Sequence, residues 1–371
     1  MIRSLTFFFI LLFIQQSHGQ VPYKMALDKL LNYAYPEADA PGIAVLISKD
    51  GKILYSFQKG LGNIEQQQQI ALSSRFRMAS VSKQVTARAV YLLAENGKVD
   101  INLPLTTWFE GLPSSWHLIT PLHLLTHSSG IWDYESLIPA DQINQLSDWD
   151  VLRIATQKNE LYFKPGTAFR YSNTGYCLLA LLVEKVSQHA FPSFVQMHLF
   201  DPAGIPQGLV YYPDSKIKSR VYGYHLTNNK FVFADQSITS ATQGDGGVYF
   251  SAKDYHNWAS KQLLPDFRNR DFLDFFRTKA IPVKNNVIYN LGLFGFYDKD
   301  NHLHLFHSGE STGFNNIIYM DVSQGLVASV FTNRDDFLIA DVFTQIASTI
   351  ALTPTISENL FLWLNKIYSG E

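Results

Sequence analysis

Apolar runs of strand length stand near both ends of the chain. Residues 42–60, "GIAVLISKDGKILYSFQKG", contain two runs rich in β-branched residues joined by Asp50-Gly51, which is a strong signal for a two-residue hairpin. Towards the other end, "HLHLFHSG", "FNNIIYMDV" and "GLVASVFTN" are strand-like, and the last two are joined through Ser323-Gln324-Gly325. These patterns predict one mostly antiparallel sheet that both ends of the chain complete.

Helical periodicity marks the segments beside and between these runs. A short helix is expected around Met25 to Ala34, and a longer one from Ser80 to about Glu95, with Gly97 as its stop signal. Residues 99–284 mix helical patterns with irregular connections marked by Pro and Gly. We therefore expect an α/β (α+β) fold in which helices flank the sheet and a helix-rich subdomain is inserted into the chain.

A chain of 371 residues exceeds the size at which one hydrophobic core usually stops growing, so two subdomains are expected. Residues 20–98 and 285–352 are assigned to a discontinuous α/β subdomain, and residues 99–284 to the helix-rich one. Residues 353–371 form a C-terminal tail, whose amphipathic "ENLFLWLNKIYSGE" indicates either a docked helix or a loose end.

Residues 1–19 have the pattern of a secretory signal peptide. One positive charge at Arg3 precedes an apolar run from Leu5 to Ile14, and the small residues Ser17 and Gly19 stand at the −3 and −1 positions of a cleavage site. The mature chain would begin near Gln20 and be secreted or periplasmic, with no membrane span after cleavage. The alternative is an N-terminal anchor helix that is retained.

Composition and charge narrow the class of protein. Hydrophobic residues make up 46% and charged residues 17% of the chain, which is typical of a folded globular protein. Thirty basic and 32 acidic residues, with no basic run, argue against nucleic acid as a partner. The single cysteine, Cys177, lies in the apolar run "YCLLALLV" and is interpreted as a buried structural thiol rather than a nucleophile.

The pattern Ser-x-x-Lys occurs three times, at Ser56, Ser80 and Ser215. Only Ser80 begins a predicted helix, where residues three apart share a face and the first-turn amides favour negative charge on an oxygen. A serine hydroxyl becomes a good nucleophile when a neighbouring base takes its proton, and Lys83 can do so if burial lowers its pKa. The alternative is that Ser80 caps the helix and Lys83 is a solvated charge.

Two further segments carry candidate chemistry. Tyr171 lies in the turn that enters a predicted helix, where a phenol can shuttle protons if nearby cations lower its pKa, and Asn173 offers a donor and an acceptor to an amide-like substrate. The alternative is a packed aromatic and an ordinary N-cap. In "HLFHSGESTGF", a strand-like run ends in the triplet His307-Ser308-Gly309. Gly309 lets the backbone there approach a ligand closely.

With Ser80-Val81-Ser82-Lys83, Tyr171-Ser172-Asn173 and His307-Ser308-Gly309 in this order, the chain resembles the serine β-lactamase and penicillin-binding superfamily. The resemblance is to the branch of class C β-lactamases, D-alanyl-D-alanine carboxypeptidases, D-aminopeptidases and related esterases. It covers roughly Pro41 to Asp335 and includes the flanking stretches "ITPLHLLTHSSGI", "FKPGTAFRYSN" and "GDGGVYFSAKDYHNW". It implies a β-lactamase/transpeptidase-like fold.

The resemblance also implies a mechanism without a cofactor. Ser80 would attack a carbonyl to form an acyl-enzyme, with Lys83 and Tyr171 sharing the role of base. The backbone N–H groups of Ser80 and Glu310 would form the oxyanion hole, and Asn173 would hold the substrate amide. The expected function is thus an exported serine hydrolase of amides or esters; the alternative is a penicillin-binding or sensor protein that acylates slowly without significant turnover.

One departure from the family pattern concerns His307, where class C β-lactamases carry lysine. Histidine is charged only near or below about pH 6.5, so recognition of a substrate carboxylate by His307 is weakened. The resemblance implies that His307, Ser308, Gly309 and Glu310 bind substrate. His302 and His304 share one face of the same strand, but no nearby partner completes a metal site in sequence, so solvent-facing histidines and no metal are expected.

Overall fold

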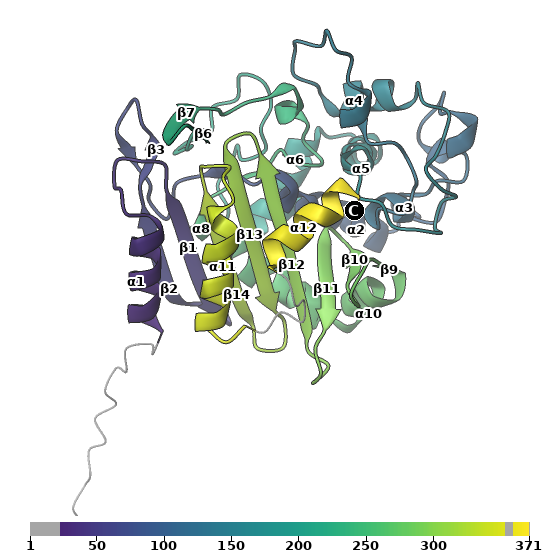
Figure 1. The fold of residues 1–371 in the computed structure, drawn as a ribbon. Coiled ribbons are helices and arrows are strands. Elements are labelled where there is room, and N and C mark those ends of the chain that lie inside the picture. Colours follow the sequence, from purple (N-terminus) through teal and green to yellow (C-terminus); the bar gives the residue numbers. More distant parts are fainter. Residues whose placement is uncertain (1–22, 353–358, 371) are drawn as a thin grey trace, which may run out of the picture.

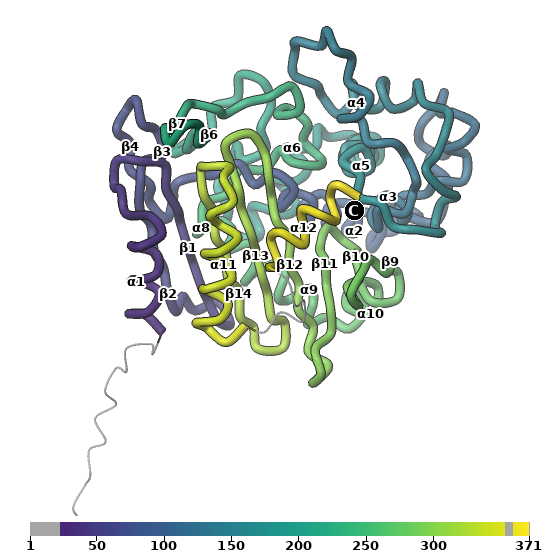
Figure 2. Tube along the Cα trace, viewed as in Figure 1, coloured from purple at the N-terminus to yellow at the C-terminus, as the bar shows by residue number. Residues whose placement is uncertain are grey.

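Strands from both ends of the chain form one eight-stranded antiparallel sheet in the computed structural model, which describes residues 23–352 and 359–370 (Figure 1). The tube in Figure 2 shows the early strand β1 lying beside the late strand β14, as their pairing requires. In order across the sheet, the strands are β2 (Lys52–Lys59), β1 (Ile43–Lys49), β14 (Leu326–Thr332), β13 (Phe314–Asp321), β12 (Leu303–Ser311), β11 (Leu293–Tyr297), β10 (Ile288–Asn290) and β9 (Ile281–Pro282). The expected fold class is confirmed.

The hairpin between β1 and β2 forms where the sequence indicates it. Asp50 and Gly51 both have positive φ angles, of 47° and 75°. A tight turn with positive φ at both central residues matches the right-handed twist of the flanking strands, and Asp-Gly tolerates that conformation.

Helices cover both faces of the sheet, so its central strands are buried on both sides. Every residue of β13 is buried. Helices α1 (Lys24–Ala34), α11 (Leu338–Thr349) and α12 (Leu360–Ser369) lie in front of the sheet in Figure 1, and α2 (Lys83–Glu95) and α8 (Ala252–Trp258) lie behind it. Burial on both faces explains why these strands read as continuous apolar runs rather than alternating ones.

The region between β5 and β9 is mainly helical and is centred on α5 (Asn173–Ser187), which is buried from Thr174 to Val183 and packs against α2, α3 and α4. The other α-helices are α3 (Pro121–Leu125), α4 (Asp148–Ala155), α6 (Phe191–Val195), α7 (Asp201–Ala203), α9 (Leu264–Arg268) and α10 (Arg270–Lys279). Three short strand pairs lie outside the main sheet: β3 (Leu61–Asn63) with β4 (Gln68–Gln69), both before this region, β5 (Phe76–Arg77) with β8 (Tyr249–Phe250), and β6 (Tyr224–Thr227) with β7 (Lys230–Phe233).

Of the predictions for the two ends of the chain, the structure bears on the C-terminal one. The signal-peptide prediction for residues 1–19 lies outside the described residues. At the other end, the segment expected to be a docked helix or a loose tail contains α12, which contacts α11 and β12. Within 23–352 and 359–370, every helix falls short of the length and hydropathy needed to cross a membrane. The subdomain boundaries stay a prediction.

Candidate active site

Ser80 lies in a single 3₁₀ turn, η1 (Ala79–Ser82), which runs directly into α2. The expectation that Ser80 opens the α-helix itself is therefore wrong by one turn, and Lys83 is the first residue of α2. Ala79, just before Ser80, has a φ of 46°. This left-handed conformation costs a non-glycine residue on the order of 1 kcal/mol, so the surrounding packing must hold the turn in place.

Part of that packing is a close approach between the segment before Ser80 and β12. A Cβ atom built on Gly309 would lie 2.0 Å from the backbone oxygen of Met78, far inside any real contact distance. The close approach inferred from the sequence at Gly309 therefore exists, but its partner in the structure is the chain's own backbone. Gly309 thus sets the separation between η1 and β12.

We expect Gly309→Ala to reduce activity by at least about tenfold and to lower the melting temperature, because the added methyl group forces η1 and β12 apart and small displacements of catalytic groups are costly. Steady-state hydrolysis and thermal unfolding of the variant test this. Gly175→Ala is the matched control, since a Cβ at Gly175 in α5 meets its neighbours at an ordinary 3.6 Å. Full activity in Gly309→Ala would contradict the assignment.

Lys83 is fully buried and joins three segments of the site. Its Nζ donates to Ser80 Oγ at 3.0 Å, to Asn173 Oδ1 at 2.7 Å and to the backbone oxygen of Asp245 at 3.0 Å. Burial lowers the pKa of Lys83 below its usual 10.5, while the charge of Asp245 opposes that shift. The alternative of a solvated charge is therefore wrong, and the amine stands where it can accept the Ser80 proton once it is neutral.

Tyr171 lies beside this pair, although its hydroxyl makes no hydrogen bond within the described residues. The Lys83 Nζ is 4.9 Å from the centroid of the Tyr171 ring. Burial, followed by the neighbouring Tyr368, raises the pKa of Tyr171 well above 10, and the Ser80 side chain only partly opposes this. The condition stated above for proton shuttling, a pKa lowered by nearby cations, is therefore not met, and the phenol holds its proton at physiological pH.

Asn173 is the first residue of α5 and both ends of its amide are engaged. Its Oδ1 accepts from Lys83, its Nδ2 donates to Glu135 Oε1 at 3.0 Å, and its backbone N–H donates to Asp133 Oδ2 at 2.5 Å. The ordinary N-cap reading is wrong, because Ser172 is the N-cap residue. In this arrangement Asn173 orients the Lys83 amine.

In the triplet His307-Ser308-Gly309 on β12, the side chains are not exposed to a substrate in the pocket. The side chains of His307 and Ser308 are fully buried. Burial lowers the pKa of His307 to about 3, so its ring is neutral, and its Nδ1 lies 3.2 Å from the Tyr368 hydroxyl. Substrate binding by these two side chains stays a prediction. Glu310 lies two residues after Ser308 on β12, and it lines the pocket.

A pocket of about 460 Å³ opens above Ser80. It is lined by Ser80, Asp133, Glu135, Ser136, Arg170, Tyr171, Asn173, Glu310, Asn365, Tyr368 and Ser369. Four of the predicted site residues therefore share one pocket. The α12 residues were not found from the sequence, because no local pattern places a C-terminal helix beside a serine nearly 290 positions earlier.

Three further histidines are held by contacts within the protein. The His127 ring lies 4.3 Å from the Tyr171 ring, and the His123 Nδ1 accepts from the Thr120 N–H within a capping box. The solvent-facing reading is wrong for His304, which is buried, with its Nε2 3.2 Å from Asp298 Oδ2 and its Nδ1 3.0 Å from the Tyr319 hydroxyl.

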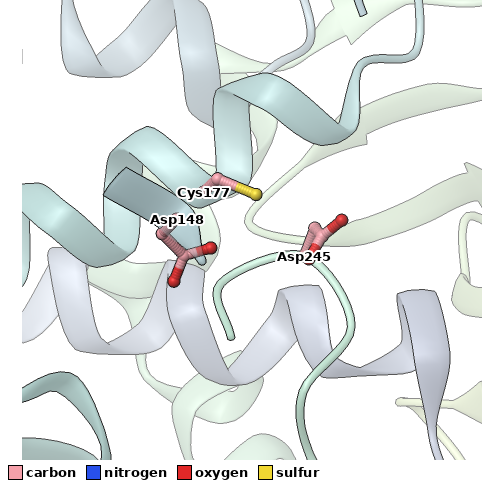
Figure 3. Close-up of side chains that lie close together, drawn as sticks. All are labelled: Asp148, Cys177 and Asp245. Carbon is pink, nitrogen blue, oxygen red and sulfur yellow. The ribbon is translucent and has the colours of Figure 1, made fainter. Parts of the chain in front are cut away.

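A second buried cluster lies behind Lys83, formed by Asp148, Cys177 and Asp245 (Figure 3). Potential metal-ligand atoms of the three lie within 4.8 Å of one another. Burial, followed by the charge of Asp245, raises the pKa of Asp148 to about 8, and burial raises that of the Cys177 thiol. Without a cation, both groups thus favour their protonated forms. We interpret Cys177 as a structural thiol in a proton-holding cluster.

This cluster predicts a pH dependence of stability. The folded pKa of Asp148, about 8, lies above its unfolded value of about 4, so the folded state holds an extra proton between these limits and stability falls as pH rises through them. We expect the free energy of unfolding to fall by about 3 to 4 kcal/mol more between pH 5 and pH 8 in the wild type than in Asp148→Asn. Urea denaturation at both pH values measures this; exposed Asp39→Asn is the control. Equal pH dependence in Asp148→Asn and wild type would contradict it.

Comparison with known proteins places this site in a family context. A model of the family described as Beta-lactamase matches residues 25–348. Penicillin-binding protein 4* of Bacillus subtilis is 29% identical over 245 residues, which cover 60% of this chain and 52% of that protein. Protein flp of Staphylococcus aureus is 24% identical over 83% of this chain and 62% of its own length. The chain thus spans about half to two thirds of the length of these relatives.

Solved structures share the fold. A penicillin-binding protein from Bacillus halodurans superimposes with a TM-score of 0.74 at 24% identity, covering 87% of this chain and 98% of that one. The D-amino acid amidase from Ochrobactrum anthropi SV3, complexed with L-phenylalanine amide, superimposes with a TM-score of 0.72 at 19% identity, covering 88% and 98%. At these identities the likeness is one of fold.

Proposed function

The chain belongs to the Beta-lactamase family, and from this premise we propose that it is a serine hydrolase that cleaves amides or esters through an acyl-enzyme on Ser80. The observation that carries the proposal is the contact of the buried Lys83 amine with the Ser80 hydroxyl at 3.0 Å. A buried amine with a lowered pKa is suited to take the proton of a serine that attacks a carbonyl.

The reaction has two steps. The Ser80 oxygen bonds to the carbonyl carbon, its proton passes through Lys83 and Tyr171 to the leaving nitrogen or oxygen, and the bond to that atom breaks. Water then adds to the acyl carbon, one of its protons returns to Ser80 along the same route, and the acid is released. The neutral Tyr171 phenol acts here as a donor to the leaving group.

The negative charge that develops on the carbonyl oxygen needs donors. We assign this role to the backbone N–H groups of Ser80 and Glu310. β11 pairs with β12 only as far as Phe306, so the later residues of β12 have an edge without a strand partner on that side. Loss of one such donor typically costs about 100- to 1000-fold in rate.

Intact-mass measurement tests the proposal. Purified mature chain is exposed to a fluorophosphonate and, separately, to a panel of 4-nitrophenyl esters, D-amino-acid anilides and nitrocefin. We expect a single fluorophosphonate adduct on Ser80 and turnover of at least one ester or anilide. A stable acyl adduct with no turnover of any substrate would instead support the alternative of a slow-acylating penicillin-binding or sensor protein. Absence of any adduct and any turnover would overturn the proposal.

We further propose that the protein is exported, on the signal-peptide pattern of residues 1–19. The test is a fusion of these residues to a reporter that is active only outside the cytoplasm, with Leu11→Arg in the apolar run as control. Reporter activity that survives this substitution, or is absent from both fusions, would contradict export.

A further inference from the structure

Helix α12 forms one wall of the catalytic pocket and is fixed there by its apolar face. Asn359 caps it, accepting from the N–H of Phe361 at 3.1 Å. The Trp363 ring lies 5.9 Å from that of Phe294 on β11. The buried residues of α12 are Leu360, Phe361, Trp363, Leu364 and Ile367. With this face on the sheet, Asn365, Tyr368 and Ser369 line the pocket.

The Tyr368 hydroxyl contacts the polar groups of β12 that lie nearest the pocket. Its hydroxyl is 2.9 Å from Ser308 Oγ and 3.2 Å from His307 Nδ1, and it accepts from the Ser308 N–H at 3.4 Å. Its ring lies 4.5 Å from that of Tyr171. Both the backbone edge and the side chain at Ser308 are therefore used by the chain itself, and a substrate placed along β12 meets Tyr368 at this point.

Glu310 adds a carboxyl group to the same wall. Its Oε1 accepts from Asn365 Nδ2 at 3.0 Å and from Ser308 Oγ at 3.3 Å, and the residue lines the pocket. Arg170 also lines the pocket and is exposed, with its guanidinium 4.0 Å from the Tyr162 ring centroid, so it is a cation of the same pocket that comes from the segment before Tyr171 and not from β12 or α12. Beside Ser308, then, the pocket presents an engaged hydroxyl and a carboxyl group.

We propose that Glu310, Asn365 and Tyr368, here called the α12 wall, determine specificity by excluding substrates whose leaving group carries a carboxylate and by selecting amides and esters with uncharged or cationic leaving groups. Burial raises the pKa of Glu310 to about 7, so its side chain is mainly anionic at pH 8.5, where the comparison below is made. At that pH a carboxylate beside Ser308 meets like charge from Glu310 and finds the hydrogen-bond donors of Ser308 engaged by Tyr368 and Glu310, and both effects raise the free energy of binding. This inference rests on the proposed function and names the substrate class of the same site.

Two esters with one acyl group, compared at pH 8.5, test it, namely 4-nitrophenyl acetate and 3-carboxy-4-nitrophenyl acetate, each rate divided by that of its uncatalysed hydrolysis. We expect the wild type to prefer the neutral ester by about tenfold or more in kcat/KM, which corresponds to about 1.4 kcal/mol. In Glu310→Gln/Tyr368→Ala the preference should fall to within about threefold. Tyr368→Phe keeps the ring and should reduce the preference partly.

Leu362→Ala is the matched control, because Leu362 is exposed on α12 and away from the pocket. Its preference should equal that of the wild type. If the double variant does not fold, Tyr368→Phe decides. A normalised wild-type ratio near one, or an unchanged ratio in Tyr368→Phe and the double variant, would overturn this inference alone. Failure of both esters together with no fluorophosphonate adduct on Ser80 would overturn the proposed function and this inference with it.

Discussion

Replacing Ser80 by alanine is expected to lower kcat/KM by about 10⁴-fold or more, as loss of the nucleophile does in serine hydrolases. The reason is that, among the described residues that line the pocket, Ser80 is the one whose hydroxyl is held by a buried amine, that of Lys83. The same variant should give no fluorophosphonate adduct by intact mass.

The chain supplies its own control for this variant. Ser56 stands in the same Ser-x-x-Lys pattern, but on strand β2 with its side chain exposed. Ser56→Ala should therefore keep wild-type activity and labelling. Turnover that persists in Ser80→Ala at more than a few per cent of wild type would remove the nucleophile assignment, because background catalysis by binding and the oxyanion hole alone is much smaller.

The sheet was predictable because its signals are local. The Asp50-Gly51 turn and the apolar runs at both ends of the chain each follow from conformational preference and burial over a few residues. Antiparallel pairing between β1 and β14 then follows from the need to bury those runs. What sequence could not place is the exact start of α2, because a 3₁₀ turn and a first α-helical turn share the same short pattern.

The pocket was predictable only in part, for a physical reason. Ser80, Lys83, Tyr171 and Asn173 were found through the order of their motifs. Tyr368, by contrast, reaches the site through the docking of α12 on β12, which is a tertiary contact without a local signature. The direction of the Tyr171 pKa shift could not be predicted, because it depends on burial by neighbours from several elements that spacing along the chain does not reveal.

Substitutions at Lys83 test the mechanism, because they separate the positive charge of this residue from its ability to accept a proton. Lys83→Arg keeps a cation in place but cannot lose its proton, and Lys83→Met removes the amine while keeping an unbranched side chain. If the amine is the base, both variants should acylate about 10³-fold more slowly or worse. If it acts only as a positive charge, arginine should retain much of the activity. Stopped-flow acylation of the two variants decides between these outcomes.

The pH profile should agree with that result. Because burial lowers the pKa of Lys83, the wild-type acylation rate should rise with pH through a midpoint below 10.5, as the neutral amine becomes available. The variants should lack this rise. Lys59→Met, at the Ser-x-x-Lys pattern on β2 where the amine contacts Asn32, should keep the wild-type profile. A rate in Lys83→Arg equal to that of the wild type would exclude Lys83 as the base. Tyr171 would then be the remaining candidate base, although its raised pKa makes it a poor proton acceptor while it holds its own proton.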